Sequence, residues 1–319
     1  MKDGKRNFAG DPRAGTPTTK IMLRALALSF AMLAVISGPC AAEITPQAAE
    51  LHKDTKTHSS EQPTPQSNSA AGLSSGEDAA AENELLERAN KSRELAGVPP
   101  LRMEESLRDA ARAHARRMVQ SEQLEHRLPG ELSLLERIGE VSPLKMDRVG
   151  ENIAYATCAL GANEALMRST PHRENLLDRG FNVAGFAAIW SKGRLYVVED
   201  FGRKVPSYTA EQSGKLVGQA IDEMRQQAGL PELVRLSPPN LGAAACSLAS
   251  EDRPNARLLA TAYDNRQIIT YTQSHPEVLP AGALQLLRNP GVRQFAVGTC
   301  YARNAAYPTG TYWVAILLY

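Results

Sequence analysis

Apolar residues recur every three or four positions in two stretches from about residue 82, and this spacing predicts two amphipathic helices. The first helix ends at residues 97–100, where Gly-Val-Pro-Pro cannot continue it. Its apolar positions are Leu85, Leu86, Ala89 and Leu95. Those of the second helix are Leu107, Ala110, Ala111, His114, Ala115, Met118 and Val119. Because His114 falls inside this stripe, we interpret it as a core histidine and not as a ligand.

The pattern changes after residue 128. Residues 128–148 are less periodic and contain turn signals at 129–130 and 142–143. A short helix is expected over residues 163–168, and another begins at Thr170-Pro171, with Thr170 as the N-cap and Pro171 at the first helical position. Two strands are expected over residues 181–190 and 195–201, and the turn at 191–193 between them predicts a β-hairpin.

The second half of the chain repeats this order of elements. Residues 95–101 resemble residues 227–233, and an alanine-rich helix follows each of them. Residues 181–185 resemble residues 295–299, and the chain ends on an expected strand over 312–319. We therefore predict two copies of one module that meet near residues 204–206. The second copy is shorter and lacks the stretch that contains His126, Glu151 and His172 in the first.

The N-terminal part has the composition of a targeting segment and a spacer. The apolar run 25–36 follows Arg24, is too short to span a membrane, and precedes small residues before Glu43. This predicts a signal peptide over residues 1–42, in which 1–21 are either an extension from a misplaced start, with Met22 the more typical start, or a long n-region. Pro39 weakens a lipoprotein reading of Cys40. Residues 43–80 are polar and predict a disordered linker.

These features predict an exported protein, extracellular or periplasmic, with no transmembrane segment in the mature chain. The net charge of +1 argues against bulk binding to nucleic acid or anionic membrane. Four arginines at near-helical spacing are expected on a solvated helix face and not in a phosphate site: Arg108, Arg112, Arg116 and Arg117.

Export permits disulfides, and loss of Cys40 with the signal peptide leaves three cysteines. Cys246 and Cys300 lie in the same half of the chain and are the expected pair, which leaves Cys158 free. The alternative is that all three are small buried apolar residues.

Two polar segments contain the candidate chemistry. Residues 150–155 read Gly-Glu-Asn-Ile-Ala-Tyr and include Glu151, and residues 169–177 read Ser-Thr-Pro-His-Arg-Glu-Asn-Leu-Leu and include His172. His126 lies upstream. Two imidazoles and a carboxylate brought into one cleft could bind a metal ion or move a proton.

In this order and spacing, these motifs and the ending Val-Val-Glu-Asp-Phe-Gly at 197–202 make residues 84–202 similar to the CAP superfamily. This superfamily comprises the cysteine-rich secretory, antigen 5 and pathogenesis-related proteins, also called SCP-like, and the resemblance is to its bacterial branch. It implies an α+β fold, an α-β-α sandwich, and the internal repeat then predicts two tandem copies of it. The first copy would span residues 81–204 and a degenerate second copy residues 207–319.

The resemblance also implies a cleft lined by two histidines and two acidic residues. His126, Glu151 and His172 match three of these positions, and Glu164 is the nearest candidate for the fourth. The chain departs from the pattern at Leu166, where many relatives have Trp, and at Glu199, where an amide is common.

The favoured interpretation is a non-enzymatic binding module. His126 and His172 would hold a metal ion such as Zn²⁺, with binding that weakens below about pH 6 as the imidazoles protonate. The resemblance also implies a lipid, sterol or envelope-protein partner. One alternative is a hydrolase, for which Ser169 is an unconvincing nucleophile because no Gly-x-Ser-x-Gly motif occurs. The other is a structural module of the cell envelope.

Overall fold

The computed structural model describes residues 42–43, 76–251, 254–260, 262–263 and 267–319. Cys40, the predicted signal peptide up to residue 41 and most of the predicted linker lie outside these residues. Strand β1 (Ala42–Glu43) pairs with β4, and β2 (Gly76–Glu77) pairs with β5. Helix α1 (Ala79–Leu95) already begins at residue 79, because the Asp78 side chain caps it by accepting from the Ala81 amide. Regular structure thus begins within the segment that we expected to be linker.

The first sheet is built on the predicted hairpin. Strands β5 (Val183–Ser191) and β6 (Arg194–Lys204) pair antiparallel around a turn at Lys192-Gly193. Strand β4 (Met146–Ala156) pairs antiparallel with β6, and β3 (Arg102–Met103) pairs parallel with β5. The strand order β1-β4-β6-β5-β2 leaves most of β4 at an edge of the sheet.

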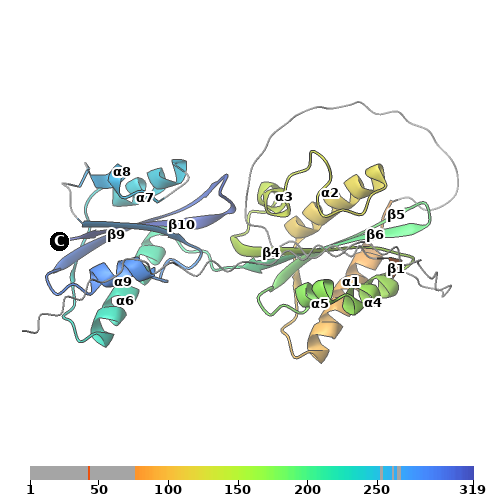
Figure 1. The fold of residues 1–319 in the computed structure, drawn as a ribbon, viewed down its shortest axis with the longest axis horizontal. Helices are drawn as coiled ribbons and strands as arrows, with labels where there is room; N and C mark the ends of the chain where they lie inside the picture. Colours follow the sequence, from red (N-terminus) through yellow and green to blue (C-terminus); the bar gives the residue numbers. More distant parts are fainter. Residues whose placement is uncertain (1–41, 44–75, 252–253, 261, 264–266) are drawn as a thin grey trace, which may run out of the picture. The chain divides into compact units, whose positions relative to one another are not determined.

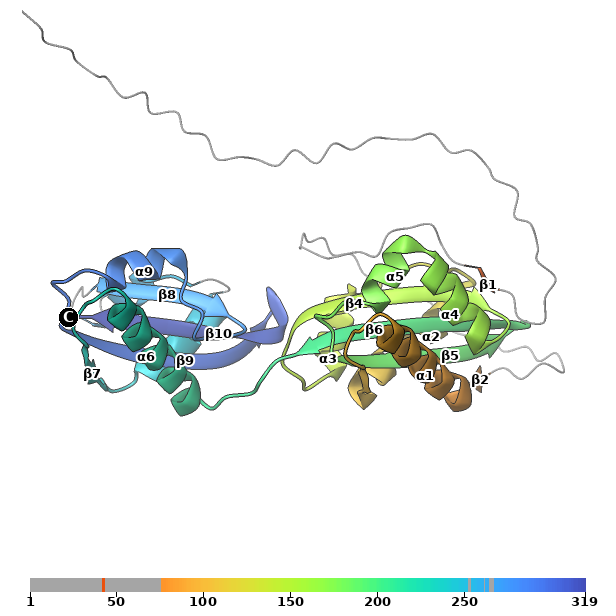
Figure 2. The same cartoon turned by 90° about the horizontal axis from the view of Figure 1, so that it is seen from below.

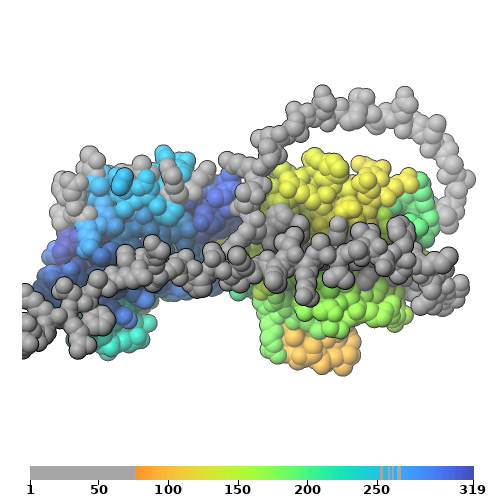
Figure 3. Space-filling model, in the orientation of Figure 1, coloured from red at the N-terminus to blue at the C-terminus, as the bar shows by residue number. Residues whose placement is uncertain are grey.

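Helices cover both faces of this sheet (Figures 1 and 2). Helices α2 (Glu105–Ser121) and α3 (Leu134–Val141) lie on one face. Helices α1, α4 (Ala159–Arg168) and α5 (Thr170–Leu176) lie on the other. Helix α2 packs closely because β5 has Gly185 beneath it, where a Cβ would lie 2.1 Å from the backbone carbon of Leu107. In the space-filling view, α2 and α3 form one side and α4 and α5 the other (Figure 3).

Three details of the first part differ from the sequence expectations. Leu95 is 79% exposed, so the apolar stripe of α1 ends earlier. Ser169, not Thr170, is the N-cap of α5. Helix α3 was not expected at all, and it begins at a capping box in which Ser133 and Glu136 bond to each other's backbone amides.

The second part of the chain, residues 207–319, also has a sheet between helices (Figure 1). Its sheet has the strand order β7-β9-β10-β8, with β7 parallel to β9 and the other pairs antiparallel. The strands are β7 (Val234–Leu236), β8 (Gln267–Gln273), β9 (Gln294–Asn304) and β10 (Tyr307–Leu318). The helices are α6 (Ala210–Gln227), α7 (Leu241–Ser250), α8 (Arg257–Ala260) and α9 (Ala281–Leu287).

The three cysteines within the described residues are disulfide-bonded. Cys246 on α7 and Cys300 on β9 form a disulfide, which confirms the expected pair. Cys158 is also disulfide-bonded, so the expectation of a free thiol at this position is wrong. No helix in the described part of the chain is both long and apolar enough to cross a bilayer.

Candidate functional site

The edge strand β4 places two polar side chains on opposite faces of the first sheet. Neighbouring residues of a strand alternate between its faces, and Glu151 and Asn152 follow this rule. The carboxylate of Glu151 contacts Arg137 of α3, whereas the amide of Asn152 donates to the carbonyl oxygen of His172 on α5. Both faces of the sheet therefore contribute to the candidate site along one edge.

Glu151 is buried and surrounded by cationic and imidazole groups. Its Oε1 lies 2.9 Å from His126 Nδ1, and its Oε2 accepts a hydrogen bond of 2.6 Å from Arg137. His114 Nε2 lies 3.8 Å from the same Oε2. Burial alone would raise the pKa of Glu151, but these neighbours outweigh it and lower the pKa to about 2. Glu151 is therefore a carboxylate throughout the physiological range.

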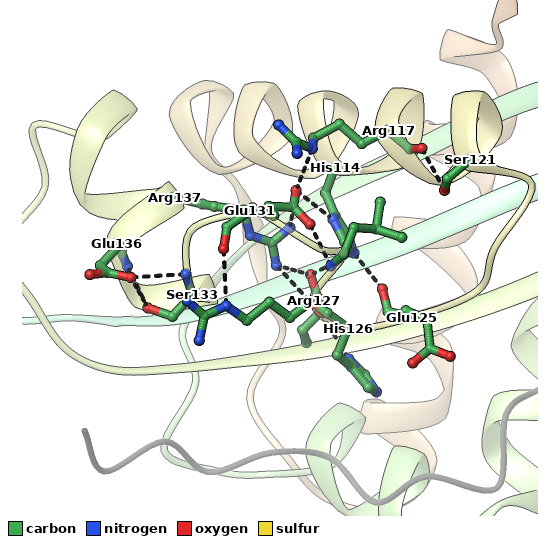
Figure 4. A network of polar contacts seen from close by, with 12 residues as sticks. His114, Arg117, Ser121, Glu125, His126, Arg127, Glu131, Ser133, Glu136 and Arg137 are labelled. Atoms are coloured by element: carbon green, nitrogen blue, oxygen red, sulfur yellow. Dashed lines mark hydrogen bonds and ion pairs between the residues drawn. The ribbon is translucent and has the colours of Figure 1, made fainter. Parts of the chain in front are cut away.

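His126 lies in the connection between α2 and α3. Its Nδ1 faces Glu151, and its Nε2 is buried without a hydrogen-bond partner among the described residues. Figure 4 shows the imidazole turned away from the group formed by Glu131, Arg137 and His114. The contact with Glu151 fixes the ring orientation and leaves Nε2 available.

His172 has a similar arrangement on the other side of the edge. A hydrogen bond of 2.7 Å joins its Nδ1 to Ser169 Oγ, and its buried Nε2 has no partner in the part of the chain that the structure describes. Burial, with a smaller contribution from the charge of His126, lowers the pKa of His172 to about 4. The sequence predicts that both imidazoles become protonated below about pH 6. In the structure, His172 becomes protonated only near pH 4.

Amide side chains connect α5 to β4. Asn175 Nδ2 donates to the Glu151 carbonyl oxygen at 3.1 Å and to Asn152 Oδ1 at 3.2 Å. Asn152 Nδ2 donates in turn to the His172 carbonyl oxygen at 3.1 Å and to Glu199 at 3.0 Å. The helix that contains His172 is thereby joined to the strand that contains Glu151.

The structure does not bring Glu164 to this group. Its side chain is 52% exposed and forms an ion pair with Arg168 at 3.6 Å on α4. The inward position beside it is occupied by Asn163, which is buried. Glu151 and the two histidines therefore face the same edge of the sheet without the fourth acid that we assigned.

The four arginines of α2 are not a free cationic surface either. Each has a carboxylate partner, among them Glu82 for Arg112 and Glu77 for Arg116. The bidentate contact of Arg112 with the buried Glu82 has distances of 2.7 and 2.6 Å. These partners explain the arginines without a phosphate ligand.

Two further buried carboxyl groups lie on β6. Burial raises the pKa of Glu199 to about 7, although the hydrogen bond from Asn152 opposes the shift. Asp200 lies opposite Glu151 across the strand pair. Burial, reinforced by the negative charge of Glu151, raises the pKa of Asp200 well above its usual range.

Sequence reasoning missed the residues that hold Glu151 and His126 in place. His114 is buried as expected, but it contacts charged groups: its Nδ1 is 2.9 Å from Glu131. Arg137 escaped notice because α3 was not predicted, although the Ser133-Leu-Leu-Glu136 capping pattern was a usable signal. Glu131 and Asp200 have no comparable sequence signal, because only the fold places them here.

The two histidines have donor atoms that fit a divalent metal ion. Both Nε2 atoms are buried and unpartnered among the described residues, and both Nδ1 atoms are held by an oxygen. A ligating histidine typically has its other nitrogen bonded in this way. No three His, Cys, Asp or Glu side chains of the described ranges are grouped as ligands. A metal held here would need water or another ligand to complete its coordination.

A family model provides independent information on this part of the chain. The model of the CAP family, the cysteine-rich secretory protein family, matches residues 86–201. These residues form a CAP domain. The match includes α2, α3 and β4, and so it contains His126, Glu151 and His172. No match was found among curated proteins.

Three solved structures resemble parts of the chain. An extracellular protein with an SCP domain from Bacillus anthracis is 24% identical, with a TM-score of 0.36, over 39% of this chain and 41% of that one. An outer surface protein of Borrelia burgdorferi is 16% identical, with a TM-score of 0.39, over 41% of this chain and all of that one. A cysteine-rich secretory protein of Staphylococcus aureus is 22% identical, with a TM-score of 0.30, over 39% of each chain. The chain spans less than half the length of the Bacillus and Staphylococcus proteins, and similarities of this size carry no functional argument.

Proposed function

We propose that this chain is an exported, non-enzymatic binding protein whose CAP domain binds a divalent metal ion, such as Zn²⁺, through His126 and His172. The observation that supports this is the pair of buried Nε2 atoms without partners in the described residues. A buried polar atom left unpaired costs free energy, and a bound ion removes that cost. Glu151 and Ser169 would act as the groups that orient the two imidazoles.

Such an ion would be held by two protein ligands and would keep open coordination positions. Open positions allow the oxygen of a small ligand or of a partner protein to bind the metal directly. The lipidic ligand or the envelope partner implied by the family resemblance would bind at this open position. Export of the chain is a prediction that concerns residues outside the described ranges.

Calorimetric titration of Zn²⁺ into the full chain at pH 7 tests the proposal. We expect one ion to bind, and we expect His126→Ala and His172→Ala each to lower the affinity by at least about ten-fold. Glu164→Gln is the matched control, because this exposed side chain lies outside the group. The absence of binding heat in the unmodified protein would remove the metal from the proposal.

Hydrolysis is the second candidate, and one contact favours it. Ser169 Oγ and His172 Nδ1 are within hydrogen-bonding distance, as a nucleophile and its base must be. In known triads a third group orients the base, but His172 Nε2 has no partner among the described residues. Esterase turnover that disappears in Ser169→Ala but persists in His126→Ala would support hydrolysis over metal binding.

We also propose that residues 207–319 are a second, degenerate CAP-like copy. The order β7-β9-β10-β8 and its strand directions correspond to β3-β5-β6-β4. Buried Arg225 contacts carbonyl oxygens of Pro231 and Leu287, as buried Arg93 contacts those of Pro99 and Leu176.

The residues of the proposed second copy that the structure describes include no counterpart of the site. The apolar spacing of α7 corresponds to that of α2, and Leu248 then falls at the position of His114. Leu248 is fully buried in an apolar cluster. The second copy would therefore contribute packing or partner contacts and not metal binding.

A further inference from the structure

The connection between α2 and α3 contains His126 but has no regular structure of its own. Residues 122–133 form turns and extended segments outside any helix or strand. Backbone hydrogen bonds therefore cannot fix this connection as they fix a helix or a strand, and side chains must do so. Figure 4 shows that the side chains around it are mainly charged groups from α2, α3 and the connection itself.

His114 of α2 bonds to two points of this connection. Its Nε2 lies 3.0 Å from the carbonyl oxygen of Glu125, the residue directly before His126. Its Nδ1 lies 2.9 Å from Oε1 of Glu131. Oε2 of Glu131 accepts in turn from the Leu128 amide at 3.1 Å. One imidazole thus links the backbone on both sides of His126 to a rigid helix.

Both partners of His114 are acceptors. A carbonyl oxygen can only accept, so Nε2 must carry a proton. Glu131 is a carboxylate by its other contacts, because its Oε2 accepts from the Leu128 amide and its Oε1 faces the guanidinium groups of Arg117 at 3.5 Å and Arg137 at 3.7 Å. A carboxylate also only accepts, so Nδ1 must carry a proton too. The hydrogen bonds therefore require the imidazolium form of a side chain that is fully buried.

We propose that His114, protonated on both ring nitrogens, is a positioning residue that fixes the 122–133 connection and thereby the direction of His126. The direction of His126 matters only if the proposed metal function is right. The two hydrogen bonds of His114 do not depend on that function. Besides Glu131, the charged groups that face the imidazole are Glu151 of β4 at 3.8 Å, and Arg137 of α3 and Arg117 of α2, both through Glu131. Asp200 of β6 lies beyond Glu151.

Nuclear magnetic resonance of the metal-free full chain at pH 7 tests the protonation. We expect proton-bearing signals for both ring nitrogens of His114. An unprotonated nitrogen in this ring would overturn the proposal, whatever the affinity of the site for metal. This measurement needs no variant, so it does not depend on how His114 substitutions fold.

Amide hydrogen exchange then tests the positioning role. The His114→Gln side chain is neutral and cannot replace both contacts of the imidazolium. In this variant we expect exchange at the Leu128 amide to accelerate at least ten-fold and the ring signals of His126 to shift. The amides within α2 should stay protected. The control is Arg117→Gln, because Arg117 also faces the Glu131 carboxylate, at 3.5 Å, but is 47% exposed and has no hydrogen bond to the backbone of the connection.

Two results would contradict the positioning role. Unchanged exchange at Leu128 in His114→Gln would show that other contacts fix the connection. Equal loss of protection in α2 and in the connection would assign His114 to general stability. Failure of Zn²⁺ to bind would remove the proposed function and leave both of these readouts interpretable.

Discussion

Glu199 and Asp200 are neighbouring carboxyl groups on β6, and both are fully buried. Because they alternate between the faces of the sheet, Glu199 contacts Asn152 while Asp200 lies opposite Glu151. Burial raises both pKa values, so the folded protein holds protons here that an unfolded chain would release near neutral pH. These two residues make the stability of the domain dependent on pH.

Replacement of Glu199 by glutamine should remove its part of this dependence. The pKa of Glu199 is about 7 in the folded protein, against an ordinary value of 4.5, so its stabilising contribution is complete below pH 4.5 and is lost as the pH rises through 7. Glu199→Gln keeps an oxygen for Asn152 and has no proton to lose. We expect equal stability near pH 4.5 and a variant more stable by on the order of 1–3 kcal/mol at pH 8.

Urea unfolding of both proteins at several pH values measures this difference. His172 acts in the opposite direction, since its pKa falls from 6.5 to about 4 on folding and its contribution is present above pH 6.5. The contribution of His172 is equal in both proteins, so it cancels when the free energy of unfolding of one is subtracted from that of the other. A difference that does not change between pH 4.5 and 8 would show that Glu199 does not titrate as described.

At the scale of elements, α3 is short but contains a central group of the site. Its residue Arg137 donates to Glu151 at 2.6 Å, and the helix begins at the Ser133–Glu136 capping box. A helix of 8 residues has little stability of its own and depends on such caps. The local sequence at Ser133 therefore affects the buried charges around Glu151.

Ser133→Ala should loosen α3. Loss of an N-cap side chain costs roughly 1 kcal/mol. We expect the free energy of unfolding to fall by about this amount, measured by chemical denaturation with Ser121→Ala as the control. Ser121 is an exposed serine whose hydroxyl donates to the carbonyl oxygen of Arg117 within α2, so it caps no helix start. Equal losses in the two variants would show that the capping box contributes nothing specific.

Element prediction succeeded where one pattern dominated. Helix α2 appears because its apolar periodicity is long and regular, and the hairpin of β5 and β6 appears with nearly the predicted bounds because two apolar runs flank a turn with glycine. Helix α3 was missed because its 8 residues include too few apolar positions to show a period. The position of Thr170 before Pro171 predicts it as the N-cap of α5, but Ser169 occupies that position and also contacts His172.

On the scale of the whole molecule, a disulfide joins α7 to β9 in the second part. The bond between Cys246 and Cys300 closes a loop with a sequence separation of 54 residues. Cross-linking stabilises a fold by restricting the unfolded chain, typically by about 2–4 kcal/mol. The second part, which we propose to be a degenerate copy, therefore depends on oxidation for part of its stability.

The double variant Cys246→Ala/Cys300→Ala should lower the free energy of unfolding of this part by about 2–4 kcal/mol. Thermal unfolding under non-reducing conditions measures the change, and the parent protein with its disulfides verified by peptide mapping is the reference. Hydrogen exchange in α2 should be unaffected, because α2 lies in the other sheet assembly. An unchanged transition would show that the bond adds no stability.

The sequence by itself determined the CAP-like region, its hairpin, its main helices and the Cys246–Cys300 pair, and it supplied the three residues proposed for the candidate site. These depend on periodicity and on short motifs, which are local properties of the chain. Only the tertiary structure decided that Glu164 is exposed, that Cys158 is bonded, and that His114, Glu131 and Arg137 surround Glu151. These facts depend on burial and on contacts between distant residues, which arise only when the helices pack on the sheet.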